Sequence, residues 1–172
     1  LYPCVCEKKE KVEVKLADGK ARTIQYMAAT AFYDPAGNVI SAAQFLERLY
    51  GELPRLFQDE DELREIWSKP DTRKRLLTGL EESGFGQDQL DEIRRLVDAV
   101  DSDLYDVLAY IRFAIEPITR EQRVLDREET INAGYTDKQQ EFLSFVLGHY
   151  IEQGVGELDD EKLPDLLELK YN

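Results

Sequence analysis

The sequence predicts a mainly α-helical fold, a compact bundle of about seven short helices preceded by a small N-terminal β-hairpin. Polar and apolar residues alternate only within the first forty positions, and the rest of the chain has the three-and-four spacing of amphipathic helices. Residues that start helices, and the Gly or Pro residues that end them, recur along this second part. Helices this short are not stable alone, so we expect them to pack on one another.

The β-hairpin is predicted by two alternating stretches and the turn between them. Residues 11–16 alternate in the manner of a half-buried strand, and residues 21–31 resume the alternation. The dipeptide Asp18-Gly19 between them is favoured where a hairpin turn requires positive φ. A second turn is expected at residues 34–38.

The helices are predicted from their caps and breaks. Ser41 with Gln44, and Thr119 with Gln122, have the spacing of capping boxes. Pro54 lies inside an apolar pattern and is expected to end or kink the first helix. Helices are predicted to begin near positions 41, 59, 70, 87, 102, 119, 136 and 160. Ser102 is the expected cap of the fifth, and Trp67 is expected to anchor the helical core.

Charge divides the chain into two parts. Residues 1–58 carry eight Lys and Arg against seven Asp and Glu, a net charge of +1, whereas residues 59–172 carry fourteen against twenty-nine, a net charge of −15. Such an acidic surface repels a phosphate backbone, whose attraction to proteins depends on Lys and Arg. A docking or scaffolding role is therefore the leading class. No apolar run approaches the roughly 18 residues of a membrane helix.

Few residues in the sequence are candidates for catalysis, metal binding or disulfide formation. Cys4 and Cys6 are expected to be free thiols, with a disulfide or half of a site completed elsewhere as alternatives; free thiols predict a cytoplasmic protein. His149, the only histidine, is expected to be a packing residue on an apolar helix face. Glu13-Val-Lys15 has the spacing of half a nuclease motif, but no suitable Asp precedes it. We predict no catalytic, cofactor-binding or metal residue.

The charged clusters are explained by ordinary structural roles. The acidic runs at 59–61, 101–103 and 159–161 lie at predicted helix starts, where the helix dipole favours carboxylates. The small basic runs at 73–75 and 94–95 are predicted to form a solvated face, or a local docking contact with phosphate or an acidic partner. The chain begins with Leu1 rather than Met, which suggests a fragment of a longer protein.

An ordered set of segments resembles the C-terminal domain of type I restriction enzyme R subunits of the EcoEI type. The segments are residues 41–51, 61–67, 102–110, 117–122, 138–143 and 163–169. The resemblance implies that residues 1–10 end a linker from a preceding helicase region. It further implies that residues 11–172 form the helical C-terminal domain, with a β unit at 11–40 and helices at 41–172.

The resemblance also implies a function. In that family the R subunit is an ATP-dependent type I site-specific deoxyribonuclease whose endonuclease and helicase parts precede the C-terminal domain, so ATP and magnesium belong to those parts. The expected role of this chain is non-catalytic assembly in a bacterial or archaeal cytoplasm, with the M and S methyltransferase subunits and the helicase lobes as partners and DNA reached through the complex.

Three alternatives remain open from the sequence. In the first, the β unit contacts DNA beside the helicase lobes through its basic residues, which are Lys8, Lys9, Lys11, Lys15, Lys20 and Arg22. In the second, the acidic surface mimics DNA. The weakest is a stand-alone enzyme.

Overall fold

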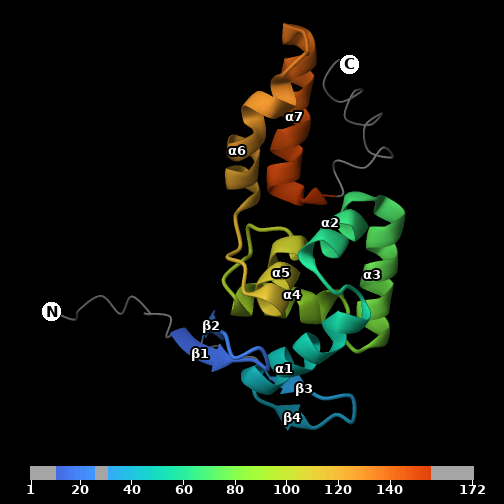
Figure 1. Ribbon diagram of the computed structural model, residues 1–172, viewed down its shortest axis with the longest axis vertical. Helices are drawn as coiled ribbons and strands as arrows, with labels where there is room; N and C mark the ends of the chain where they lie inside the picture. Colours follow the sequence, from blue (N-terminus) through green and yellow to red (C-terminus); the bar gives the residue numbers. More distant parts are fainter. Residues whose placement is uncertain (1–10, 26–30, 156–172) are drawn as a thin grey trace, which may run out of the picture. The chain divides into compact units, whose positions relative to one another are not determined.

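The computed structural model describes residues 11–25 and 31–155, without the side chains of residues 128–132. The elements in this part, drawn in Figure 1, are β1 (Lys11–Lys15), β2 (Ala21–Gln25), β3 (Phe32–Tyr33), β4 (Val39–Ile40), α1 (Ala42–Glu52), the 3-10 helix η1 (Leu53–Arg55), α2 (Glu60–Ser68), α3 (Pro70–Glu82), α4 (Gln87–Leu96), α5 (Leu104–Phe113), α6 (Arg120–Asn132) and α7 (Asp137–Gln153). The mainly α-helical class with an N-terminal hairpin is confirmed. The helix predicted at 160–169, the acidic run at 159–161 and both cysteines lie outside the described residues.

The chain divides into two compact units. Unit 1 consists of Leu1–Val100 and Leu104–Pro117, and unit 2 consists of Asp101–Asp103 and Ile118–Asn172. The strands and α1 to α5 therefore belong to unit 1, while α6 and α7 belong to unit 2. The hydrophobic pattern of the sequence does not predict this division, because it marks where helices begin and end but not which of them pack together.

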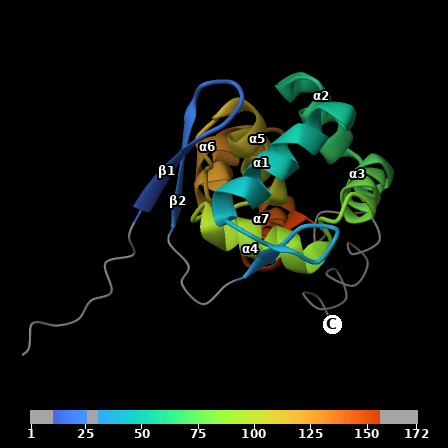
Figure 2. The ribbon, with the colours of Figure 1, turned by 90° about the horizontal axis from the view of Figure 1, so that it is seen from below.

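Both predicted turns are confirmed. β1 and β2 pair antiparallel from Lys11↔Gln25 to Lys15↔Ala21, and Gly19 takes the positive φ of +76° that the turn between them requires. β3 and β4 form a second, shorter antiparallel pair around the 34–38 turn. Figure 2 shows the β1–β2 ribbon beside the helices of unit 1.

The helix starts largely follow the predicted caps. Ser41 and Gln44 form a complete capping box, and η1 follows α1 at Pro54. Thr119 accepts the Gln122 amide, but the Gln122 side chain donates to Asp126 instead of returning to the cap. The predicted Ser102 cap is wrong. Because α5 begins at Leu104, the residue next to its start is Asp103, and Ser102 is buried with its carbonyl accepting from Arg120.

The core of unit 1 is built around α5, which contacts α1, α2 and α4. Its buried side chains are Leu104, Asp106, Val107, Leu108, Ala109, Tyr110 and Ile111. Trp67 packs against this core but is only half-buried, so it anchors the edge of the core rather than its centre. The Arg73 guanidinium lies 5.6 Å from the Trp67 ring centroid and donates to the Trp67 carbonyl at 2.8 Å, which fixes the end of α2 against α3.

Arg22 joins the β1–β2 ribbon to the end of α5, and its side chain is completely buried. Its Nε donates to the Tyr110 carbonyl at 2.9 Å and its Nη2 to the Ile111 carbonyl at 2.8 Å. These carbonyls belong to the last turn of α5, where the Tyr110 carbonyl also accepts the Ala114 amide at 2.9 Å. The guanidinium also pairs with both carboxylate oxygens of Asp18, and the Tyr110 hydroxyl accepts from the Thr23 amide. The interpretation of Arg22 as a DNA-contacting side chain is therefore wrong.

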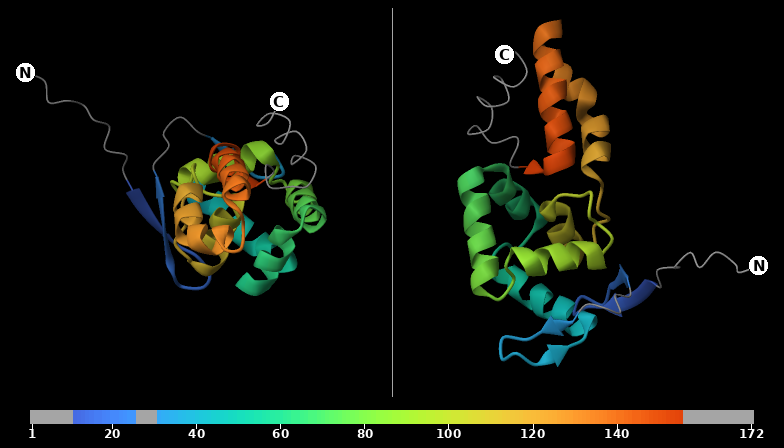
Figure 3. Two further views of the ribbon diagram at one scale, coloured as in Figure 1. Left: turned by 90° about the horizontal axis from the view of Figure 1, so that it is seen from above. Right: turned by 180° about the vertical axis from the view of Figure 1, so that it is seen from behind.

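In unit 2, α6 and α7 lie side by side (Figure 3) and a buried carboxylate joins them to the 101–103 segment. Asp103 is 5 % exposed and accepts from Arg123 Nη1 at 2.6 Å and from the Tyr150 hydroxyl. Arg120 adds two donations to backbone carbonyls, to Ser102 and to Ile151. Charge-assisted bonds of this kind are the strong ones in proteins.

The environment of Tyr150 predicts a loss of stability in alkali. Burial, and then the hydrogen bond to Asp103, raise the pKa of Tyr150 above its ordinary value of 10.0. Because the folded state holds this proton more tightly than the unfolded chain, the stabilisation is fully present below about pH 10 and declines as the pH rises further. We expect urea titrations at pH 8 and pH 11 to show a steeper loss of stability in the parent than in Tyr150→Phe. Equal losses in the two proteins would contradict this account.

Candidate docking pocket

The residues that the sequence offers for chemistry do not come together. Glu13 and Lys15 are exposed on β1, in unit 1. His149 is half-buried on α7 in unit 2, and its ring meets the Phe145 ring edge-on at a centroid distance of 4.8 Å. The His149 ring therefore packs against Phe145 within α7. Across residues 11–25 and 31–155, no three His, Cys, Asp or Glu side chains form a group that could hold a metal ion.

Several side chains of the charged runs make contacts with other residues of the fold. Asp59 caps α2 by accepting the Glu62 amide at 2.8 Å, as the helix-start interpretation predicts. Arg73 is buried against α2, and Arg95 pairs with Glu92 at 2.9 Å. Neither basic run therefore presents all of its charge to solvent. Within the described part of the chain, no helix is both long enough and apolar enough to cross a membrane.

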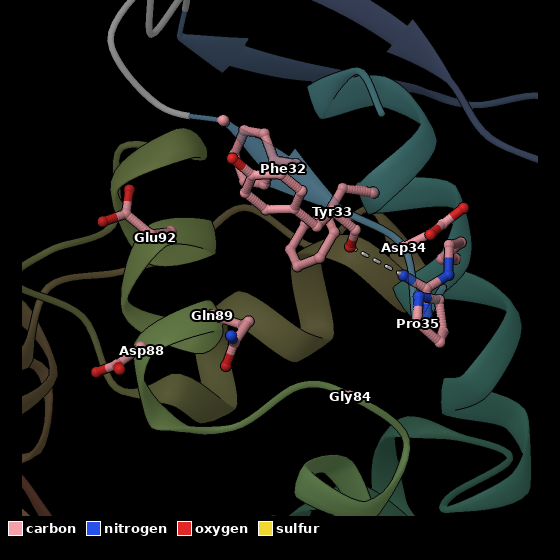
Figure 4. Close-up of a pocket in the computed structure, with 11 residues that line it drawn as sticks. Phe32, Tyr33, Asp34, Pro35, Gly84, Asp88, Gln89 and Glu92 are labelled. Atoms are coloured by element: carbon pink, nitrogen blue, oxygen red, sulfur yellow. Dashed lines mark hydrogen bonds between the residues drawn. The ribbon is translucent and has the colours of Figure 1, made fainter. Parts of the chain in front are cut away.

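A pocket of about 250 Å³ opens in unit 1 between β3 and its following turn, α1 and the start of α4 (Figure 4). Its walls come from three stretches of chain, residues 31–35, 45–48 and 84–92. The side chains that decide its chemistry are Phe32, Tyr33, Asp34, Arg48, Asp88 and Glu92. In Figure 4, Gln89 extends from α4 toward the β3 side, while Asp88 and Glu92 project from the other side of the helix and flank the pocket.

The turn at one edge of the pocket is held in place by Asp34. Its carboxylate accepts the Ala36 amide at 3.0 Å, the Asn38 amide at 2.9 Å and the Asn38 side-chain amide at 3.1 Å. Gly37 supplies the positive φ of +85° that closes the turn. The edge is therefore organised before any ligand arrives, which lowers the entropic cost of binding.

The apolar floor of the pocket is formed by Phe32 and Phe45, and Phe45 in turn contacts Phe85. The Phe32 and Phe45 centroids are 4.8 Å apart, and Phe45 lies 5.3 Å from Phe85. All three side chains are buried, so the floor belongs to the core of unit 1. Arg48 lies over the Phe85 ring at 5.4 Å and makes a long hydrogen bond of 3.5 Å to the Tyr33 carbonyl, drawn as a dashed line in Figure 4.

The polar lining is predominantly negative. The residues that line the pocket include three carboxylates, those of Asp34, Asp88 and Glu92, and one guanidinium, that of Arg48. In Figure 4 the Asp88 and Glu92 side chains point away from Asp34 and Pro35. Hydrogen bonds from the Asn38 backbone and side chain lower the pKa of Asp34, so this carboxylate stays charged near neutral pH. Glu92 Oε1 accepts from Arg95, but Glu92 Oε2 is buried with no hydrogen-bond donor among the described residues.

Exposed apolar side chains stand beside the pocket. Tyr33 and Val39 are cross-strand partners on β3 and β4, and their side chains are 53 % and 71 % exposed. Paired residues on one face of a two-stranded ribbon lie close together, so they form one apolar surface. An apolar surface beside charged side chains and an ordered turn suits the recognition of a protein segment.

The sequence predicts each segment that lines this pocket, but it does not predict that these segments lie next to one another in the fold. The turn at 34–38 and the helices that begin near 41 and 87 are all expected from local signals. Nothing in the sequence relates these three segments to one another, so no local signal indicates the pocket.

The described elements define a mainly α-helical protein with an N-terminal β-hairpin. Comparison with protein-family models identifies one matching family. The family model described as EcoEI R protein C-terminal matches residues 43–172. The chain therefore belongs to the family of C-terminal domains of type I restriction enzyme R subunits. Neither the search of curated proteins nor that of solved structures found a match.

Proposed function

We propose that this chain is a non-catalytic assembly domain that attaches the ATP-driven restriction motor to the methyltransferase core of M and S subunits. The family match over residues 43–172 carries the proposal. The net charge of −15 on residues 59–172 supports a protein partner over a phosphate backbone. ATP and magnesium would then act in the motor and nuclease parts of the R subunit, in the cytoplasm of the host cell.

In the alternative function, in which the β unit contacts DNA, Arg22 is no longer available as a contact residue. Lys11, Lys15 and Lys20 are exposed on the β1–β2 ribbon and remain available to phosphates. Arg22, the residue best suited to bidentate phosphate recognition, is fully committed to Asp18 and to the end of α5. Lys8 and Lys9, which this alternative also uses, lie outside the described residues.

Binding measurements separate the two functions. We expect the chain, passed over immobilised M and S subunits, to bind with an association rate that falls as salt rises, while dissociation changes less. A non-cognate duplex on a parallel surface should show little binding. Tight duplex binding without binding to the methyltransferase core at micromolar concentration would reverse the assignment.

The chain should also be catalytically silent. Incubation with ATP, magnesium and plasmid DNA is expected to give no phosphate release and no nicking above a blank, because we assign no nucleotide or metal site to it. Activity that copurifies with the chain through two different columns would contradict the proposal.

A further inference from the structure

On the basis of the proposed function, we propose that the open edge of β1 binds an extended segment of the methyltransferase core by strand addition, and that acidic and apolar residues alternate in this segment. In strand addition the main chain provides much of the affinity, and the alternating side chains provide the specificity.

The two edges of the β1–β2 ribbon differ. On the β2 edge, the Thr23 amide donates to the Tyr110 hydroxyl at 2.6 Å, and Arg22 donates to two carbonyls of α5. Helix α4 also contacts β2. Among the described residues, β1 pairs only with β2, so its other edge is open.

The pairing of β1 with β2 identifies the main-chain groups at the open edge. Hydrogen-bonded and non-hydrogen-bonded pairs alternate along antiparallel strands. Because the Leu16 amide donates to the Lys20 carbonyl at 3.3 Å, the even-numbered residues of β1 form the hydrogen-bonded pairs. The amides and carbonyls of Lys11, Glu13 and Lys15 therefore point away from β2, and no hydrogen bond joins them to another described residue. A row of such groups is a template for a further strand.

The side chains of β1 specify the chemistry of the added segment. Lys11, Glu13 and Lys15 are exposed on one face of the strand, whereas Val14 on the other face is buried. Val12 lies on the same face as Val14 but is 44 % exposed, so unit 1 leaves this apolar side chain uncovered. Side chains directly opposite each other on neighbouring strands interact. The best match is therefore an acidic residue opposite each lysine and an apolar residue opposite Val12.

The same side chains disfavour two other occupants. Glu13 lies between Lys11 and Lys15 on the open face, where its carboxylate repels a phosphate backbone, and Val12 has no counterpart on such a backbone. Full-length antiparallel pairing with a second copy of β1 would place Glu13 opposite Glu13 and each lysine opposite a lysine. Like charges directly opposite each other are destabilising. A partly apolar, acidic segment of another protein avoids both conflicts.

The first test compares two substitutions of Glu13 in the intact R subunit. Proline removes an amide that is not bonded to β2, which an edge strand tolerates, but it deprives an added strand of that donor. Threonine removes the same carboxylate and keeps the amide, so Glu13→Thr is the matched control. We expect the Kd for the M and S core to rise at least about tenfold in Glu13→Pro and to change less than about twofold in Glu13→Thr.

The second test concerns the charge of the partner segment. Lys11→Glu with Lys15→Glu reverses the charge of the open face, and Lys69→Glu with Lys74→Glu makes the same change of net charge at other exposed positions of unit 1. We expect the association rate with the core to fall at least about fivefold in the first variant and less than about twofold in the second. An equal fall in both variants would contradict an acidic partner at β1.

The outcomes separate the edge of β1 from the assembly function. If the parent binds the core and Glu13→Pro binds as tightly as Glu13→Thr, the inference is wrong and the proposed function stands. If the parent does not bind the core, the proposed function itself fails.

Two further outcomes identify a different occupant. If Lys11→Glu with Lys15→Glu weakens the binding of a DNA duplex while Glu13→Pro leaves core binding unchanged, the ribbon contacts DNA and the inference is overturned. If Glu13→Pro dissociates a dimer of the R subunit and leaves core binding unchanged, the occupant is a second copy, which also overturns it.

Hydrogen exchange of the unaltered R subunit, resolved to single amides, gives a result that misfolding of a variant cannot imitate. Binding of the core should slow exchange at least about tenfold at Glu13 and Lys15, whose amides have no partner among the described residues. Exchange should change much less at Val12 and Val14, whose amides are already paired with β2. Unchanged exchange at Glu13 and Lys15 would overturn the inference whatever the variants do.

Discussion

Replacement of Arg22 by Leu is expected to lower the free energy of unfolding of unit 1 by about 1.5–3 kcal/mol, because it removes the hydrogen bonds of a buried charged group, while the Asp18 carboxylate is exposed enough to be solvated. The substitution removes five hydrogen bonds: two to the end of α5, two to Asp18 and one to the Lys20 carbonyl. Leucine cannot donate to the Ile111 carbonyl, whereas the Tyr110 carbonyl keeps its bond from the Ala114 amide. For a domain stabilised by about 5–15 kcal/mol, such a loss is a large fraction of the total.

Fluorescence offers a selective readout for this effect. The chain has one tryptophan, Trp67, and it lies in unit 1, so its emission in a urea titration follows that unit alone. Lys15→Leu is the matched control, since it removes an exposed cation from the same ribbon and should change stability by about 0.5 kcal/mol or less. Arg22→Lys should fall between the two, because an ammonium cannot reproduce the planar fork. Coincident transitions for Arg22→Leu and Lys15→Leu would refute the role assigned to Arg22.

The second large effect is expected in unit 2, where Asp103→Ala removes the acceptor shared by Arg123 and Tyr150. Loss of one member of a buried, charge-assisted cluster costs about 3 kcal/mol or more. The destabilisation should include α6 and α7, because Arg123 and Tyr150 lie on these helices.

Hydrogen exchange resolves this effect by peptide. A loss of about 3 kcal/mol corresponds to roughly hundredfold faster exchange in the protected amides of α7 when exchange follows local opening. Asp126→Ala is the control, because its carboxylate is exposed and accepts only a neighbouring Gln122 amide within α6. Equal exchange in α7 for the two variants would show that Asp103 does not hold the unit together.

Local signals were sufficient for much of the fold. Ser41 and Thr136 start α1 and α7 with complete capping boxes, Pro54 ends α1, and Gly154 takes a positive φ after α7. Each of these features is decided by residues within a few positions of one another, so the sequence alone contains the necessary information.

Arg22 could not be understood from its neighbours. Its position two residues before Ile24 puts it on the buried side of β2, but the acceptors that make its burial tolerable lie 88 and 89 residues away on α5. A buried charge needs such partners. The sequence does not show that these acceptors lie near Arg22, so Arg22 is predicted to be exposed like the neighbouring lysines.

The pocket was missed for the same reason. Its rim combines Asp34 from a turn, Arg48 from α1 and Glu92 from α4, three residues that no sequence spacing relates. The charge division at residue 58 even separates them, since the first two come from the near-neutral part and the third from the acidic part. The pocket therefore crosses the compositional boundary at residue 58 that suggested the docking role.

The assembly role is tested most directly by sedimentation of the M and S core with the R subunit, either intact or lacking the segment equivalent to this chain. We expect the intact subunit to move with the core as one complex. The truncated subunit should sediment separately while retaining its DNA-stimulated ATP hydrolysis, which shows that the motor itself remains folded. A truncated subunit that joins the core with the same stoichiometry and affinity as the intact one would contradict the assignment of this domain to assembly.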